Sequence, residues 1–132
     1  MDAKRKDEFV QSWMAIQTSL PGTEPYESNF WAHEELADLC EFSPDDAWEV
    51  ILALVHATRA DTLLQAIGAG PLADLMTLHG EQYIALVEGA AEADGRFRMA
   101  MTGAWLDGED TPVWKKYYEI AGIEPPFPNE GS

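Results

Sequence analysis

Helical periodicity dominates the pattern of hydrophobic and polar positions along this chain. Phe9, Trp13, Ile16 and Leu20 recur at intervals of three and four residues, which predicts a helix that ends at Pro21. A connector is expected at 23–28. Similar apolar stripes and their capping residues predict further helices over 30–41, 44–57, 61–67, 72–78, 81–94, 97–106 and 112–121. The pattern therefore predicts an all-α fold of seven or eight short helices with no sheet.

Several boundaries of these helices carry specific signals. Ser43 can cap a helix whose first position is Pro44, and the acids that follow favour the positive end of that helix. The segment 68–70 is Gly-Ala-Gly, which we expect to form a tight turn between helices, because glycine permits close backbone approach or positive φ. Pro71 then opens the next helix, and Gly80 ends it after His79.

A short repeat indicates how the helices pair. The sequence Leu-Ala-Asp-Leu at 36–39 recurs at 72–75, an offset of 36 residues. At the same offset three further apolar pairs match, namely Phe42 with Leu78, Trp48 with Ile84 and Ile51 with Val87. A period of this length is typical of stacked helical hairpins, so a HEAT-like paired-helix arrangement is one expectation and an irregular helical bundle is the other.

Composition supports one folded unit. Hydrophobic residues make up 46% of 132 residues, which is outside the range of disordered chains. We expect one domain over 1–124, followed by an extended Pro-rich tail over 125–132, because prolines prevent the helix from continuing. Cys40 is the single cysteine and follows an apolar stripe, which favours a small buried residue rather than a nucleophile.

Charge narrows the classes of partner. The chain carries 24 Asp and Glu against 8 Lys and Arg, a formal charge of −16. Such a field repels nucleic acid and anionic membrane and attracts basic protein surfaces. No apolar run is long enough for a membrane span, and the basic start lacks the apolar stretch of a signal peptide, so we expect a cytoplasmic protein.

One stretch resembles a known family. Residues 68–75 followed by His79-Gly80 are similar to the glycine-X-glycine-proline-leucine-glutamate-aspartate-leucine and histidine-glycine signature of small bacterial proteins of unknown function. An aromatic-arginine pair at 97–98 before Trp105, and Trp48-Glu49 upstream, extend the resemblance over roughly 30–106. Ala73 stands where the signature has an acid. The resemblance implies a bacterial, helical, intracellular protein and no particular activity.

The sequence gives only weak signals for a catalytic or metal site. His33 and Asp38 lie five residues apart, which spreads them around a helix instead of aligning them as metal ligands, so no metal or other cofactor is predicted. The Gly-Ala-Gly segment has neither the preceding strand nor the following lysine of a phosphate cradle. His79 suits the end of a helix, where nearby carbonyls accept hydrogen bonds. We therefore do not expect an enzyme, although a small hydrolase using His79 and nearby acids is an alternative.

The strongest functional candidate is an acidic surface. Seven acids fall within sixteen residues and span two predicted helices and their turn: Glu34, Glu35, Asp38, Glu41, Asp45, Asp46 and Glu49. Such a patch can attract a basic protein, for instance a nuclease, and pair its carboxylates with Arg or Lys. The main hypothesis is an immunity or antitoxin-type protein that neutralises a basic toxin. The alternative is a helical-repeat adaptor in which the charge serves solubility.

Overall fold

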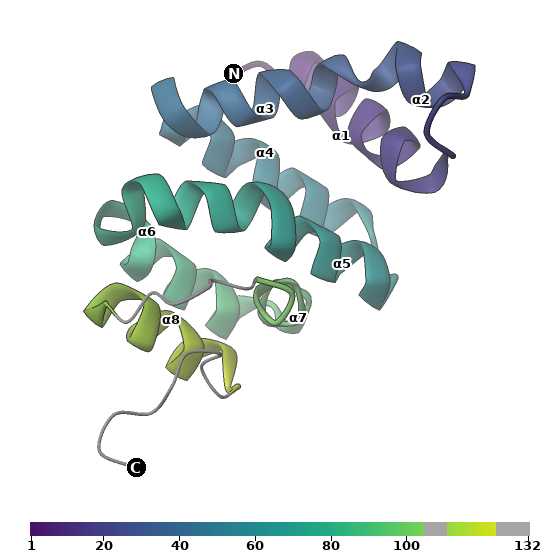
Figure 1. Cartoon of the computed structure of the whole chain (residues 1–132). Helices are drawn as coiled ribbons and strands as arrows, with labels where there is room; N and C mark the ends of the chain where they lie inside the picture. Colours follow the sequence, from purple (N-terminus) through teal and green to yellow (C-terminus); the bar gives the residue numbers. More distant parts are fainter. Residues whose placement is uncertain (105–110, 124–132) are drawn as a thin grey trace.

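The computed structural model describes residues 1–104 and 111–123, and all of its regular structure is helical (Figure 1). The elements are α1 (Ala3–Thr18), α2 (Glu24–Asn29), α3 (Trp31–Phe42), α4 (Pro44–Ala57), α5 (Asp61–Ile67), the π-helical segment η1 (Gly68–Leu72), α6 (Ala73–Ala93), α7 (Gly95–Met101) and α8 (Pro112–Ala121). The described residues contain no strand, so the all-α prediction is confirmed. The predicted tail over 125–132 and the position of Trp105 lie outside the described residues.

The first helix follows its apolar stripe. Phe9, Trp13 and Ile16 are buried on one side of α1, whereas Leu20 lies beyond the helix and is 75% exposed. The predicted connector over 23–28 is wrong, because this segment forms the short helix α2. Thr23 precedes that helix and Pro25 occupies its first turn, where proline's missing N–H costs nothing.

Two helical hairpins stack in the middle of the fold. Between α3 and α4 the backbone leaves helical geometry at Ser43 (φ −141°, ψ 63°), and α6 is interrupted in the same way at His79 (φ −137°, ψ 27°). These two corners are 36 residues apart, the offset of the sequence repeat. Ile51 and its counterpart Val87 are both fully buried. The chain changes direction at His79, and α3 lies beside α6 (Figure 1). The repeat thus corresponds to two equivalent hairpins.

The segment η1 joins α5 to α6 without a turn, so the predicted break at 68–70 is wrong. Pro71 lies inside this helical stretch, where it cannot donate a backbone hydrogen bond and its ring would crowd the carbonyl four residues earlier. The wider π-helical spacing accommodates that ring. Cys40, fully buried on α3, donates from Sγ to the Pro71 carbonyl at 3.6 Å. Burial raises the pKa of this thiol to about 12, and the predicted structural role of Cys40 is confirmed.

Glycine allows η1 and α7 to touch backbone to backbone. A Cβ atom on Gly68 would lie 1.7 Å from the Ala100 carbonyl oxygen, and one on Gly103 would lie 2.0 Å from the Gln65 carbonyl oxygen. Gly68 therefore has the close approach that the sequence predicted, with helical rather than positive φ. None of the helices in the described part of the chain combines the length and apolar character needed to cross a bilayer.

Candidate binding surface on α3 and α4

The structure divides the seven candidate acids between two adjacent helices. Glu34, Glu35, Asp38 and Glu41 lie on α3, and Asp45, Asp46 and Glu49 lie on α4. Glu35, Asp46 and Glu49 are half-buried, and the other four are exposed. The helices pack against each other, as expected from the sequence. They do not form one open acidic patch, because the start of α1 reaches over part of it.

The chain terminus neutralises two of these acids. The α-amine of Met1 lies 3.5 Å from Asp46 Oδ1 and 3.4 Å from Glu49 Oε2, and Lys6 Nζ lies 3.7 Å from Glu49 Oε1. Attraction to Glu49, and then to Asp46, raises the pKa of the Met1 amine. The positive charges at the start of the chain therefore compensate the α4 side of the predicted surface.

Two further acids each accept a hydrogen bond from one side chain. Arg5 donates from Nη2 to Glu35 Oε2 at 2.5 Å, and this hydrogen bond raises the pKa of the guanidinium. The same guanidinium carbon lies 4.8 Å from the centre of the Trp31 ring, a cation–π geometry that fixes its position. On α4, the Tyr83 hydroxyl donates to Asp45. Four of the seven acids thus have partners within the chain.

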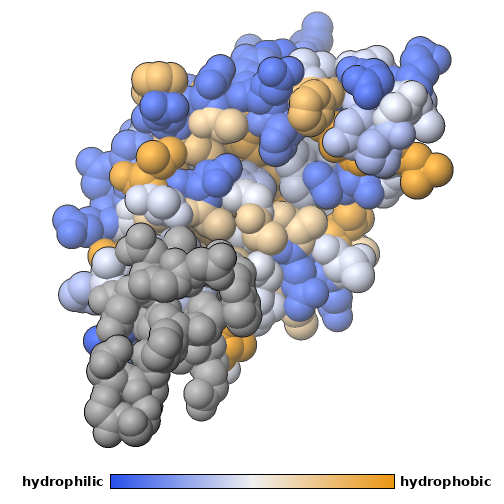
Figure 2. Space-filling model, viewed as in Figure 1, coloured by the Kyte–Doolittle hydropathy of each residue, from blue (hydrophilic) through white to orange (hydrophobic). Residues whose placement is uncertain are grey.

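The other three acids form an open row along α3. Glu34, Asp38 and Glu41 are separated by four and three residues, so they share one helical face, and all are exposed. Within residues 1–104 and 111–123, none of the three forms an ion pair with a base. We call this row the α3 stripe. Figure 2 shows that hydrophilic residues cover most of the surface over α3, with small hydrophobic areas between them.

Two exposed apolar side chains lie at one end of the stripe. Phe42 is 75% exposed and Leu78 is 51% exposed. His79 donates from Nε2 to the Glu41 carbonyl at 3.3 Å, which joins the corner of the second hairpin to the end of α3. Because Phe42 follows Glu41 and Leu78 precedes His79, this contact places both apolar residues near the C-terminal end of α3. We call Phe42 and Leu78 the apolar corner.

The sequence pattern missed the apolar corner. The repeat matches the two residues with each other, but this match does not indicate whether their side chains are buried or exposed. The available signal was the position of Phe42 directly after Glu41, off the buried face of α3 that carries Leu36 and Cys40. The contact of His79 with a carbonyl agrees with its predicted structural role, although that carbonyl belongs to α3 and not to its own helix.

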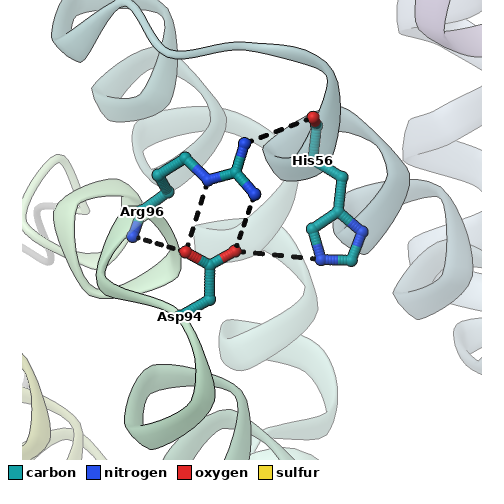
Figure 3. A network of polar contacts seen from close by, with 3 residues as sticks. All are labelled: His56, Asp94 and Arg96. Atoms are coloured by element: carbon teal, nitrogen blue, oxygen red, sulfur yellow. Dashed lines mark hydrogen bonds and ion pairs between the residues drawn. The ribbon is translucent and has the colours of Figure 1, made fainter.

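A second polar cluster braces the junction of α4, α6 and α7 (Figure 3). Asp94 caps α7 by accepting from the Arg96 backbone N–H at 2.9 Å and pairs with the Arg96 guanidinium at 3.2 Å. Arg96 also donates to the His56 carbonyl, and His56 Nε2 lies 3.9 Å from Asp94 Oδ2. This spacing is too long for the oriented histidine–carboxylate hydrogen bond of a catalytic triad. The arrangement holds helices together.

The described residues form neither a metal site nor a phosphate-binding turn. No group of three or more His, Cys, Asp or Glu is placed to hold a metal ion there. The glycine segment continues a helix, so its N–H groups do not face outward as a cradle. For example, Gly68 N–H is directed at the Gln65 and Leu64 carbonyls. The aromatic residues Trp114, Tyr117 and Tyr118 on α8 are buried in the core.

Comparison with known proteins adds a family to this description. Residues 19–122 match a family described as a family of unknown function (DUF6869), and this match covers most of the chain. The chain belongs to this family. The DUF6869 segment contains the whole α3 stripe and the apolar corner, whereas α1 precedes it. Neither the curated proteins nor the solved structures contained a match to the chain.

Proposed function

We propose that this protein is a non-enzymatic inhibitor of immunity or antitoxin type, which binds a basic protein through the α3 stripe and the apolar corner. The observation that carries the proposal is the open stripe. Four acids on α3 and α4 have partners within the chain, whereas Glu34, Asp38 and Glu41 are exposed and pair with no base in the described part of the chain. Three such carboxylates on one helical face can pair with Arg or Lys across an interface.

The apolar corner supplies binding affinity that charged pairs alone do not provide. Charged pairs at the rim of an interface mainly increase the association rate, whereas buried aromatic and aliphatic anchors carry most of the affinity. Phe42 is a large exposed anchor directly beside Glu41. A basic surface built for phosphate, such as that of a nuclease, would be attracted by the net charge of −16 and covered by this face. The cytoplasm is the expected location.

The segment 68–80, which carries the family resemblance, has a structural role in this proposal. We expect this glycine-proline segment to be a shared feature of the family, because Gly68 admits no Cβ against α7 and Pro71 sets the π-helical spacing. It would maintain the second hairpin, whose corner at His79 contacts the end of α3. Its role is thus to hold the binding face and not to carry chemistry.

The test is affinity capture with two variants of equal charge. The stripe variant carries Glu34→Gln, Asp38→Asn and Glu41→Gln. The control carries Glu24→Gln, Glu27→Gln and Glu92→Gln, which removes three exposed acids elsewhere. Each interfacial pair contributes about 0.5–1 kcal/mol, so the stripe variant should bind roughly 10- to 100-fold more weakly. Thermal unfolding of both variants checks that the fold is retained.

The expected result is one basic protein that is retained by the wild type and by the control, released by salt, and lost with the stripe variant. Its own activity, measured with the purified pair, should fall when this protein is added in equimolar amount. Equal loss with both variants would show that net charge and not the stripe is responsible. A partner that is retained at high salt by all three proteins would contradict the proposal and favour the adaptor alternative.

A further inference from the structure

A pocket of about 310 Å³ opens where α1, α3 and the π-helical segment meet. Its apolar wall includes Trp13 from α1, Leu36 from α3 and Pro71 from η1. Its polar groups are Gln17, His33 and Asp74. The volume lies at the lower end of the range for small-molecule sites, and a mainly apolar wall with a few convergent polar groups is typical of them.

The π-helical segment shapes this pocket. Gly70 faces it, and a Cβ built on Gly70 would meet no atom within 4 Å. Its neighbour Gly68, by contrast, is pressed against the backbone of α7. The segment therefore packs tightly on one side and leaves open space on the other. π-Helical turns within longer helices are often found at functional sites, where they displace side chains from regular spacing.

Asp74 gives the pocket a negative charge. Among the described residues, no Lys or Arg lines the pocket, so none of them supplies a full counter-charge to the carboxylate there. The surrounding protein reduces the hydration of this carboxylate and raises its pKa, and the proximity of His33 partly offsets this effect. The His33 ring stacks on Phe30 with centroids 5.1 Å apart and an interplanar angle of 13°, which fixes the imidazole at the edge of the pocket.

We propose that this pocket binds a small organic cation, an amine or amidine on a flat apolar body, with the cationic nitrogen paired to Asp74. The apolar body would lie against the accessible alanines of the pocket, Ala37, Ala66 and Ala69, because Trp13, Leu36 and Pro71 are themselves buried. Gln17 and His33 can supply further hydrogen bonds at the edge. The charge of −16 on the whole chain favours cations over neutral or anionic ligands of the same shape. This site is separate from the α3 stripe and does not depend on the proposed inhibitor function.

Three probes of one shape and different charge test the proposal on the full chain. The probes are 2-phenylethylamine, the neutral 2-phenylethanol and the anionic phenylacetate. Binding is followed by amide chemical-shift changes in a nitrogen-15-labelled sample. The amine should bind at least about 10-fold more tightly than the alcohol, with the largest shifts at His33, Gly70 and Asp74, whereas phenylacetate should not bind.

Matched variants separate the pocket from the general field of the protein. Asp74→Asn removes the charge in the pocket, and Asp38→Asn removes the charge at the repeat-equivalent position on α3, outside the pocket. Gly70→Leu places a side chain in the open space. The affinity for the amine should fall at least about 10-fold with Asp74→Asn, should be lost with Gly70→Leu, and should change less than about 2-fold with Asp38→Asn.

The opposite results would overturn the proposal. These are equal binding of amine and alcohol, equal effects of Asp74→Asn and Asp38→Asn, or the absence of amine binding at millimolar concentration in the wild type. Gly70→Leu should keep the thermal unfolding midpoint of the wild type or raise it. Loss of binding in that variant can therefore be attributed to the filled pocket and not to unfolding.

Discussion

The contact between η1 and α7 gives a sharp prediction for Gly68→Ala. The added Cβ would lie 1.7 Å from the Ala100 carbonyl oxygen, and real Cβ contacts essentially never fall below 3.0 Å. The helices would have to separate by about 1.3 Å, and the obstacle is backbone, not the movable end of a side chain. Because protein interiors are packed at crystal-like density, such a shift disturbs contacts along the whole of α7.

The magnitude follows from two opposing effects. Overpacking of a rigid site lowers the free energy of unfolding by about 3 kcal/mol or somewhat more. Replacing glycine by alanine in a helix raises it by about 1 kcal/mol. We therefore expect Gly68→Ala to lower the free energy of unfolding by at least about 2 kcal/mol. For a chain of this size, that corresponds to a fall of roughly 8 °C in Tm.

Gly70→Ala, two residues away, is the matched control. Its Cβ meets nothing within 4 Å, and its φ is not positive. Only the helix propensity then changes, so the variant should be more stable by about 0.5–1 kcal/mol. Thermal and urea unfolding followed by far-UV circular dichroism measure both variants. Equal stability of Gly68→Ala and Gly70→Ala would refute the close approach of η1 and α7.

Three further predictions concern side chains outside the two proposed sites. Asp94→Ala should lower the free energy of unfolding by about 1–2 kcal/mol near neutral pH through loss of the α7 cap. Hydrogen bonds from Arg96 lower the pKa of Asp94. The loss of unfolding free energy caused by Asp94→Ala should therefore be complete above about pH 4 and should disappear as the pH falls through the lowered pKa. Urea titrations at several pH values measure this dependence. Cys40, with a pKa of about 12, should react with a thiol reagent at least about 100-fold more slowly than free cysteine, at a rate set by unfolding. Tyr83→Phe should cost about 1 kcal/mol in urea unfolding, because the hydrogen bond to Asp45 is lost. A pH-independent Asp94 effect, rapid modification of Cys40 in the folded protein or an unchanged Tyr83 variant would contradict the respective argument.

The helices with long apolar stripes could be predicted from the sequence, because burial on one face imposes a period that is visible in the residues. The capping signal at Ser43 predicted the position of the first corner, although the Ser43 side chain makes no capping hydrogen bond, and Gly80 predicted the break near His79. By contrast, α2 has no buried residue, so it leaves no apolar period. Its signals are Thr23 and Pro25, which are equally common in turns.

The candidate surface could be predicted only in part, for an electrostatic reason. Sequence spacing located all seven acids on two packed helices. Whether an acid remains open depends on partners that are distant in sequence. Met1, Arg5 and Lys6 lie 30 to 48 positions before the acids that they contact, and Tyr83 lies 38 positions after Asp45. Net charge cannot reveal such pairing, because it counts compensated and uncompensated acids alike. Three of the seven acids are open among the described residues, and the surface that we propose combines these three with two exposed apolar side chains.

The pocket could not be predicted from the sequence, for a different reason. A glycine-alanine-glycine-proline run predicts a turn, since its two glycines and its proline disfavour a regular helix. Packing overrides this preference: Cys40 satisfies the Pro71 carbonyl, and α7 holds Gly68 in place. The resulting π-helical turn brings Asp74 to the same pocket as His33, although 41 positions separate them in sequence.

The family match separates the two proposals in a testable way. The α3 stripe and the apolar corner lie within residues 19–122, so binding of a basic protein through this face can be common to the family. The cation pocket draws Trp13 and Gln17 from α1, which precedes the matched segment, and the compensation of Glu35 and Glu49 also depends on α1. We therefore expect relatives that differ in this helix to retain the stripe and to bind the amine more weakly. Such relatives would also leave Glu49 on α4 less compensated, since Lys6, one of the two bases that pair with it, lies on the same helix.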